Sequence, residues 1–225
     1  MVLSRRELTP NVSGFRLVAQ PGAAFTWVPG QYLLLSTDDA PGLEIPFSIA
    51  SAPDAARPGE FELAISNVGS RELVAKLAPG TELSVSSPRG AFGFRPATGA
   101  TLLVGIGTGL APLRAVLQAT LAHAAPEPVV LLYGARSESD LLYRDELESL
   151  ARLHARFRFE PTLSRADAAF TGRRGRVQDH LRELVAPLRD VHAYVCGTKP
   201  MVEDTVQRLT RELGVDPTRV WSEAF

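Results

Sequence analysis

The chain has 225 residues, and its 45% hydrophobic and 22% charged residues are typical of a folded globular protein, not of a disordered or fibrous one. The formal net charge is only −1, so the chain lacks the excess positive charge with which proteins bind nucleic acid or anionic membranes. Its single cysteine, Cys196, excludes an intrachain disulfide and any metal cluster that this chain would hold through several thiolates.

The start of the chain and its most apolar window carry no export or membrane signal. Arg5 and Arg6 stand where a signal peptide would need an apolar stretch, which indicates a cytoplasmic protein. Residues 101–125 form the most apolar window, but Pro112 and Arg114 interrupt it, so we expect strand, loop and helix there and no membrane span. The four histidines show no metal-ligand spacing, and we expect no metal site.

The first part of the chain consists of short extended runs separated by turn signals. Several runs alternate apolar and polar residues, and Pro-Gly pairs stand between them at Pro29-Gly30, Pro41-Gly42, Pro58-Gly59 and Pro79-Gly80. Closely spaced strands with such turns predict an antiparallel sandwich or barrel. We expect one helix, over Arg71–Leu77, and strands over Val12–Gln20, Tyr32–Ser36, Phe47–Ser51, Phe61–Ser66 and Glu82–Ser86.

After residue 97 the pattern changes to apolar strands that alternate with longer helical stretches, which is typical of βαβ units around a parallel sheet. We therefore expect two domains, a β-barrel over residues 1–97 and an α/β domain over residues 98–225. The expected strands are Leu102–Val104, Val129–Tyr133, Phe157–Leu163, Val191–Cys196 and Arg219–Trp221. The expected helices are Pro112–Ala124, Asp140–His154, Val177–Leu188 and Met201–Leu213, the last of them ended by Gly214.

A glycine-rich turn, Gly105-Ile106-Gly107-Thr108-Gly109, joins the first strand of the second domain to its first helix. Glycines let a ligand approach the backbone, and the N–H groups at a helix start favour a phosphate. The spacing is not that of a G-x-G-x-x-G motif, because Leu110 stands where the third glycine belongs. From these residues alone, a nucleotide site and a plain strand-to-helix turn are equally good interpretations.

Seven short motifs, in this order, resemble the ferredoxin–NADP reductase family over nearly the whole chain. Each motif is weak alone, but together they span a domain boundary that the residue pattern indicates independently. The motifs are Pro29-Gly30-Gln31-Tyr32, Pro46-Phe47-Ser48-Ile49-Ala50-Ser51, Gly105 to Pro112, Tyr133-Gly134-Ala135-Arg136, Asp140-Leu141-Leu142-Tyr143, Cys196-Gly197 and Glu223-Ala224-Phe225.

The resemblance implies an N-terminal flavin-binding β-barrel and a C-terminal NAD(P)-binding α/β domain, without a fused ferredoxin domain. It implies hydride transfer from NAD(P)H to bound FAD, with FMN as the other flavin, and then electron transfer to a ferredoxin, flavodoxin or oxygenase component. One alternative is an NAD(P)H:flavin reductase that uses flavin as a dissociable substrate. Another is a non-catalytic flavin-binding electron-transfer or regulatory subunit, which the intact glycine turn disfavours.

By the same resemblance, the segment Pro46-Phe47-Ser48-Ile49 contacts the flavin, with Phe47 against the ring and the Ser48 hydroxyl near its N5 atom. The family places an arginine for the flavin phosphate two residues before the aromatic residue, and this chain has Ile45 there. Ser70 or Arg71 could replace that contact. Ser70 is equally well interpreted as the N-cap of the following helix.

For the nicotinamide nucleotide, the resemblance points to two groups of residues. The first surrounds the glycine turn and the end of a later strand, and comprises Gly105, Gly107, Thr108, Gly109, Pro112, Cys196 and Gly197. The second comprises Ser164, Arg165 and Arg173, which lie within a segment, residues 152–176, that has seven arginines and two acidic residues. A 2′-phosphate contact by Arg165 would favour NADPH over NADH, whereas a solvated surface is the simpler reading of such a segment.

The predicted catalytic residues are Ser48, Cys196, Glu223 and Phe225. Cys196 ends a strand at the expected edge of the nucleotide site, where its small side chain would admit the nicotinamide. The resemblance suggests a carboxylate beside the site at Glu223 and a terminal aromatic ring that covers the flavin at Phe225. A small core residue and a frayed tail are the alternatives to these roles.

Overall fold

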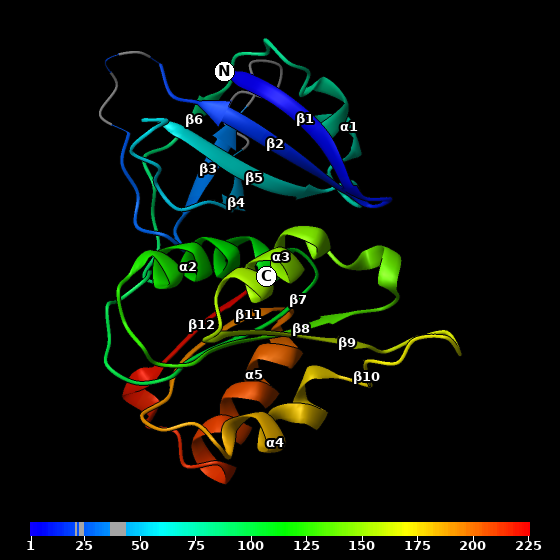
Figure 1. Cartoon of the computed structure of the whole chain (residues 1–225). Helices are drawn as coiled ribbons and strands as arrows, with labels where there is room; N and C mark the ends of the chain where they lie inside the picture. The colour runs from blue at the N-terminus through cyan, green and yellow to red at the C-terminus, as the bar shows by residue number, and fades with distance from the viewer. Residues whose placement is uncertain (21, 23–24, 37–43) are drawn as a thin grey trace.

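The computed structural model describes residues 1–20, 22, 25–36 and 44–225, and its N-terminal part consists of two small antiparallel sheets (Figure 1). The sheets have strand orders β1-β2-β5 and β4-β3-β6, and a bridge between Ile49 and Leu63 joins them into a barrel-like unit. Its elements are β1 (Val2–Thr9), β2 (Val12–Val18), β3 (Tyr32–Ser36), β4 (Ile45–Ser48), β5 (Glu60–Ser66), α1 (Arg71–Lys76) and β6 (Ser84–Val85).

The C-terminal part is a six-stranded parallel sheet of order β10-β9-β8-β7-β11-β12. Its strands are β7 (Thr101–Ile106), β8 (Val129–Ala135), β9 (Phe157–Leu163), β10 (Arg173–Arg174), β11 (His192–Gly197) and β12 (Val220–Ala224). Its helices are α2 (Leu110–Ala122), α3 (Arg144–Leu153), α4 (Leu181–Val185) and α5 (Lys199–Gln207), with a π-helical turn over Arg208–Glu212 and 3₁₀ turns over Gly107–Gly109, Glu138–Asp140, Val177–His180 and Pro217–Arg219.

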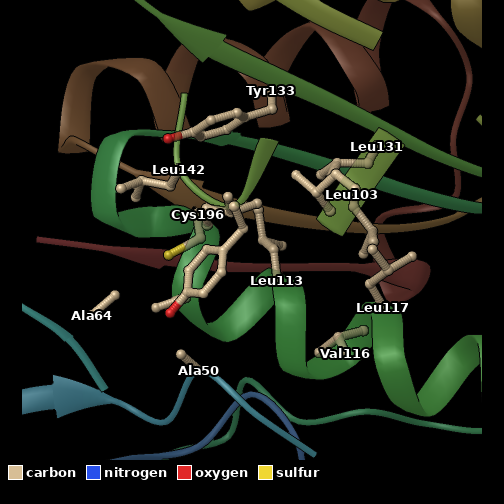
Figure 2. Packing of buried hydrophobic residues seen from close by; sticks show 14 of the residues in the cluster. Ala50, Ala64, Leu103, Leu113, Val116, Leu117, Leu131, Tyr133, Leu142 and Cys196 are labelled. Carbon is tan, nitrogen blue, oxygen red and sulfur yellow. The ribbon is translucent and has the colours of Figure 1, made fainter. Parts of the chain in front are cut away.

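The helices divide between the two faces of this sheet. Figure 1 shows α2 and α3 between the sheet and the barrel, and α4 and α5 on the opposite face. The buried cluster on the barrel side includes Ala50 and Ala64 of the barrel together with Leu113 and Val116 of α2. Figure 2 shows Ala50 and Ala64 on barrel segments below the sheet, and Leu113 and Val116 on the helix beside them. One apolar core therefore continues from the sheet across the domain boundary.

The predicted fold class is confirmed, with an antiparallel barrel-like part followed by a parallel α/β part. The predicted boundary at residue 97 stays a prediction. Strand β1 was not predicted, because its middle residues, Ser4 to Glu7, are polar and exposed and the strand lacks apolar alternation, as suits an edge strand. Strand β10 was missed because it has only two residues. The Pro41-Gly42 turn lies outside the described residues.

Three predicted helices differ from the observed ones. Helix α3 begins only at Arg144, since Tyr143 has a φ of 53° and interrupts the helical backbone. The predicted helix over Val177–Leu188 is a 3₁₀ turn followed by the short α4, and the last helix changes to π-helical geometry after Gln207. In the described part of the chain, no helix is long and apolar enough to cross a membrane.

Candidate functional site

The glycine turn after β7 is shaped by contact with the end of β11. A Cβ atom on Gly109 would lie 2.4 Å from the Cys196 carbonyl oxygen, and one on Gly105 would lie 2.4 Å from Leu113 Cδ1. Real Cβ atoms do not approach so closely, so both positions need glycine for packing. These two predicted residues therefore support the turn from its buried side.

Gly107 is the glycine that faces open space. Its φ is +53°, and a Cβ there would meet no atom within 4 Å. The buried Tyr133 hydroxyl donates to the Gly107 carbonyl oxygen at 3.0 Å, which holds the turn from below, and burial raises the pKa of this tyrosine. The turn thus presents an exposed backbone at the N-terminus of α2, where a phosphate group would be stabilised.

Cys196 and Glu223 lie side by side, since they are paired residues of the parallel strands β11 and β12. Burial, reinforced by the charge of Glu223, raises the pKa of the Cys196 thiol, and burial raises the pKa of the Glu223 carboxyl. The Cys196 side chain is only 1% exposed and belongs to the core between the sheet and the barrel (Figure 2). That the small Cys196 side chain admits the nicotinamide stays a prediction; in this structure the surrounding core covers its sulfur.

The end of the chain is part of the sheet. Residues up to Ala224 pair with β11, and the Phe225 N–H donates to the Gly197 carbonyl oxygen at 3.2 Å. The tail is therefore not frayed, which removes the alternative reading of Glu223 and Phe225. Phe225 is 64% exposed and lies one residue beyond the edge where Gly197 and Ala224 end their strands.

The hairpin β3–β4 carries the predicted flavin motif, and its two faces differ. Phe47 lies opposite Leu33 and packs, partly buried, against the barrel core. On the other face Ser48 lies opposite Tyr32, and Pro46 lies opposite Leu34. Because residues alternate between faces along a strand, Pro46 and Ser48 share their face with Tyr32 and Leu34.

This second face offers a partly exposed surface of an aromatic ring, a leucine, a proline and a hydroxyl group. Sequence reasoning missed Tyr32 and Leu34, although both lie in or beside the Pro29 to Tyr32 motif. Ile49 does not belong to the surface, since it is fully buried in the barrel core and donates its N–H to the Gln31 carbonyl oxygen. A cofactor contact by Ile49 stays a prediction, and the burial of its side chain leaves only the backbone for such a contact.

The two predicted positions for the flavin phosphate also differ in their surroundings. Ile45 lies opposite the buried Leu35 and packs against the barrel core, so the aliphatic side chain suits its place. Ser70 is the N-cap residue of α1 by position, but its side chain makes no capping hydrogen bond. The Ser70 hydroxyl is therefore not used by the helix that follows it.

Most arginine side chains of residues 152–176 bind groups of this chain itself. Arg173 donates to Glu160 at 2.9 Å and to both carboxylate oxygens of Glu183 at 2.7 and 2.9 Å, and these hydrogen bonds, Glu183 first, raise its pKa. A cofactor contact by Arg173 stays a prediction, and in this structure two carboxylates occupy its guanidinium. Arg174 donates to the carbonyl oxygens of Ala166, Asp167 and Phe170.

Arg165 lies beside the end of the neighbouring strand. Its N–H donates to the Arg136 carbonyl oxygen at 2.8 Å, and the Ser164 N–H donates to the Ala135 carbonyl oxygen at 3.0 Å. Arg176 follows β10, the next strand of the sheet. In the described part of the chain, the exposed side chains of Arg136, Arg165 and Arg176 make no ion pair, and all three follow the carboxyl ends of adjacent parallel strands.

Comparison with known proteins gives consistent results over the chain. Residues 103–207 match the family described as the oxidoreductase NAD-binding domain. Ferredoxin–NADP reductase B of Sorangium cellulosum is 40% identical over 233 residues, covering 98% of this chain and 94% of that protein. The naphthalene 1,2-dioxygenase system ferredoxin–NAD(P)(+) reductase component of Pseudomonas putida is 32% identical, covering 93% of this chain and 64% of that protein.

Two further similarities are relevant. An NAD(P)H-flavin reductase of Aliivibrio fischeri is 28% identical, covering 94% of this chain and 92% of that protein. Among solved structures, the Amycolatopsis cytochrome P450 reductase GcoB superposes with a TM-score of 0.88 at 28% identity, covering all of this chain and 68% of that one. The similarity therefore includes both the barrel and the α/β part.

Proposed function

This chain belongs to the ferredoxin–NADP reductase family, and from that membership we propose that it transfers hydride from NADPH to bound FAD and passes the electrons to a ferredoxin or an oxygenase component. A flavodoxin would serve as acceptor by the same chemistry. The acceptors named for the similar proteins are the reason for this choice, and the residues of the site supply the roles below.

The observation that carries the proposal is the exposed backbone at Gly107. It lies between the end of β7 and the start of α2, the end of β11 lies beside the same turn, and β12 pairs with β11. Ligands of open parallel sheets bind at the carboxyl ends of the strands, and a helix N-terminus stabilises a pyrophosphate. Thr108 and Gly109 continue the same turn, and Pro112 in the first turn of α2 lacks an N–H that would otherwise need an acceptor.

The hairpin face of Tyr32, Leu34, Pro46 and Ser48 fits an aromatic ring system with a polar edge. The apolar side chains supply contact area, and the Ser48 hydroxyl can donate a hydrogen bond to a ring nitrogen. When bound, FAD supplies the ring nitrogen that accepts the hydride. The Glu223 carboxyl, whose raised pKa favours its protonated form, can hold a proton beside this edge of the sheet.

A preference for NADPH rests on three exposed arginines whose side chains make no ion pair within the part of the chain that the structure describes. Arg165 is the expected contact of the 2′-phosphate, and Arg136 and Arg176 add positive charge at the adjacent strand ends. A 2′-phosphate is present in NADPH and absent from NADH, so the arginines act on one nucleotide only.

The deciding experiment is the absorption spectrum of the purified protein after incubation with FAD and gel filtration, followed by anaerobic addition of NADPH or NADH. We expect flavin to stay with the protein and to be bleached faster by NADPH. Bleaching at equal rates by both nucleotides would contradict the NADPH preference. A protein that binds flavin but is not reduced would instead be the non-catalytic electron-transfer subunit.

A flavin reductase with dissociable flavin is the second candidate. Ile45 favours it, because an aliphatic side chain cannot pair with a flavin phosphate, and the similar flavin reductase covers almost the whole chain. Loss of flavin during gel filtration, together with steady reduction of added FMN or riboflavin by NADPH, would support this candidate over the first.

A further inference from the structure

Arg114 is a buried arginine on α2 that contacts both parts of the molecule. Its Nε and Nη2 atoms donate to the two carboxylate oxygens of Glu146 on α3, at 2.8 and 2.9 Å. Its Nη1 atom donates to the Ala50 carbonyl oxygen at 2.6 Å and lies 3.3 Å from Glu62 of β5. One guanidinium thus joins the two helices of the α/β part to the barrel.

The barrel side of these contacts is the end of the predicted flavin motif, Pro46 to Ser51, and the residue that follows it. Ala50 comes two residues after Ser48, and its N–H donates to the Glu62 carbonyl oxygen at 2.7 Å. Two residues later, the Ala52 N–H donates to Gln118 of α2 at 2.8 Å. Helix α2 therefore holds the end of the flavin segment at two points, through Arg114 and Gln118.

The charges around Arg114 balance across the boundary. We call Arg6, Glu62, Arg114 and Glu146 the interdomain cluster; its two basic and two acidic side chains come equally from the barrel and from the α/β part. Both arginines contact the Tyr143 ring, whose centroid lies 5.2 Å from Cζ of Arg6 and 4.3 Å from Cζ of Arg114. Although burial disfavours the charge of Arg114, the hydrogen bond to Glu146 and the charges of Glu146 and Glu62 outweigh it and raise its pKa.

We propose that Arg114 is a positioning residue for hydride transfer, because it connects the flavin-binding segment to the helix that begins at the nucleotide-binding turn. Arg114 lies five residues after Gly109, which along a helix corresponds to about 7.5 Å. The polar contacts of Arg114 and Gln118 therefore add to the apolar packing across the boundary and connect the segment after Ser48 with the nucleotide turn. The effect on hydride transfer rests on the proposed function.

An arginine is needed at this position for geometric reasons. The planar guanidinium forms a two-bond contact with Glu146 and still directs another N–H to a backbone oxygen, which a lysine ammonium cannot do in the same arrangement. Hydride transfer depends steeply on the distance between the reacting rings, so a shift of about 1 Å between the two parts is expected to cost up to about 100-fold in rate.

The test compares Arg114→Gln, Arg114→Lys and Gln118→Ala with a matched control, Arg144→Gln. Arg144 also binds two carboxylates, Glu138 and Glu148, but both lie in the α/β part. We expect Arg114→Gln to slow flavin reduction by saturating NADPH in single-turnover mixing by about 10- to 100-fold, with flavin affinity changed less than about threefold. Arg114→Lys and Gln118→Ala should show smaller losses, and Arg144→Gln should stay close to wild type.

A second readout needs no cofactor. Hydrogen exchange of the segment Ile49–Ala52 in protein without added flavin should be faster in Arg114→Gln and in Gln118→Ala than in Arg144→Gln. Unchanged exchange, or equal slowing of hydride transfer in Arg144→Gln, would overturn the positioning role. If Arg114→Gln fails to fold, the lysine variant and Gln118→Ala decide the matter by the same two measurements. Absence of flavin reduction in the wild type would contradict the proposed function, whereas normal wild-type reduction with an unslowed Arg114→Gln would contradict only this inference.

Discussion

The glycine turn after β7 and the hairpin β3–β4 form the two sides of the proposed site, and they are built on different principles. In the turn, close packing of the backbone requires glycine, since a Cβ on Gly109 would lie 2.4 Å from the Cys196 carbonyl oxygen. In the hairpin, side chains alternate between the barrel core and an open face, so neighbouring residues have unrelated environments.

This difference determines how each side tolerates change. A central strand of a parallel sheet cannot move away from an added methyl group without disturbing the ladder on both of its edges. A residue on the open face of a hairpin can change without disturbing the core. The open face of the hairpin can therefore accept other residues more readily than the turn at Gly109 can.

The largest effect is expected from Gly109→Ala. The new Cβ would press against the β11 backbone, so the free energy of unfolding should fall by about 3 kcal/mol, with loss of NADPH binding. Gly107→Ala is the control, since its Cβ faces open space and only the positive φ is unfavourable, at about 1 kcal/mol. Urea unfolding of both variants checks this, and equal losses would contradict the packing role of Gly109.

Arg165→Ala should affect one nucleotide only. Loss of a charge-assisted contact with the 2′-phosphate is expected to cost about 2 kcal/mol, which raises KM for NADPH about 30-fold and leaves NADH almost unchanged. Arg173→Ala is the comparison, because Arg173 is paired with Glu160 and Glu183 and should affect stability and both nucleotides alike. Steady-state kinetics with each nucleotide tests this prediction. An equal rise in KM for NADPH and NADH in Arg165→Ala would mean that Arg165 has a structural role.

Tyr32→Leu should weaken flavin binding about fivefold, or about 1 kcal/mol, because it removes an aromatic ring from the face that Ser48 shares. Thermal stability should change little, since the Tyr32 side chain is only partly buried. Phe47→Leu alters a ring that packs against the barrel core and should lower stability more than Tyr32→Leu does. Flavin titration and thermal unfolding of both variants test the assignment of the two faces, and it is wrong if their effects are reversed.

The smallest effect concerns pH. Burial raises the Glu223 pKa above its ordinary value of 4.5 in the folded chain, so the unfolded chain loses this proton first. Stability contributed by this group is greatest below pH 4.5 and falls as pH rises through the higher folded pKa. Glu223→Gln should remove this fall in urea unfolding between pH 4 and 8, whereas Glu203→Gln, an exposed control on α5, should retain it. A wild-type pH profile in Glu223→Gln would contradict the effect of burial.

The sequence predicted the class of fold because its signals are local. Alternating apolar and polar residues with Pro-Gly turns indicated the antiparallel part. Apolar strands that alternate with longer helical stretches indicated the parallel part. It did not predict β1, whose polar residues pair with β2, or the late start of α3 after Tyr143, whose φ is 53° and whose ring contacts Arg114 of another helix.

For the site, the sequence alone determined which strand ends carry glycines, the cysteine and the terminal carboxylate, and the parallel order then brought Cys196 and Glu223 together. Only the tertiary structure decided which arginines are free. Arg165 and Arg173 are eight residues apart in the same arginine-rich segment. Only Arg173 is paired with Glu183, which lies on another element. Periodicity describes neighbours along the chain, whereas an ion pair or a contact such as that of Arg114 with Ala50 joins residues far apart in sequence, and only folding determines those pairs.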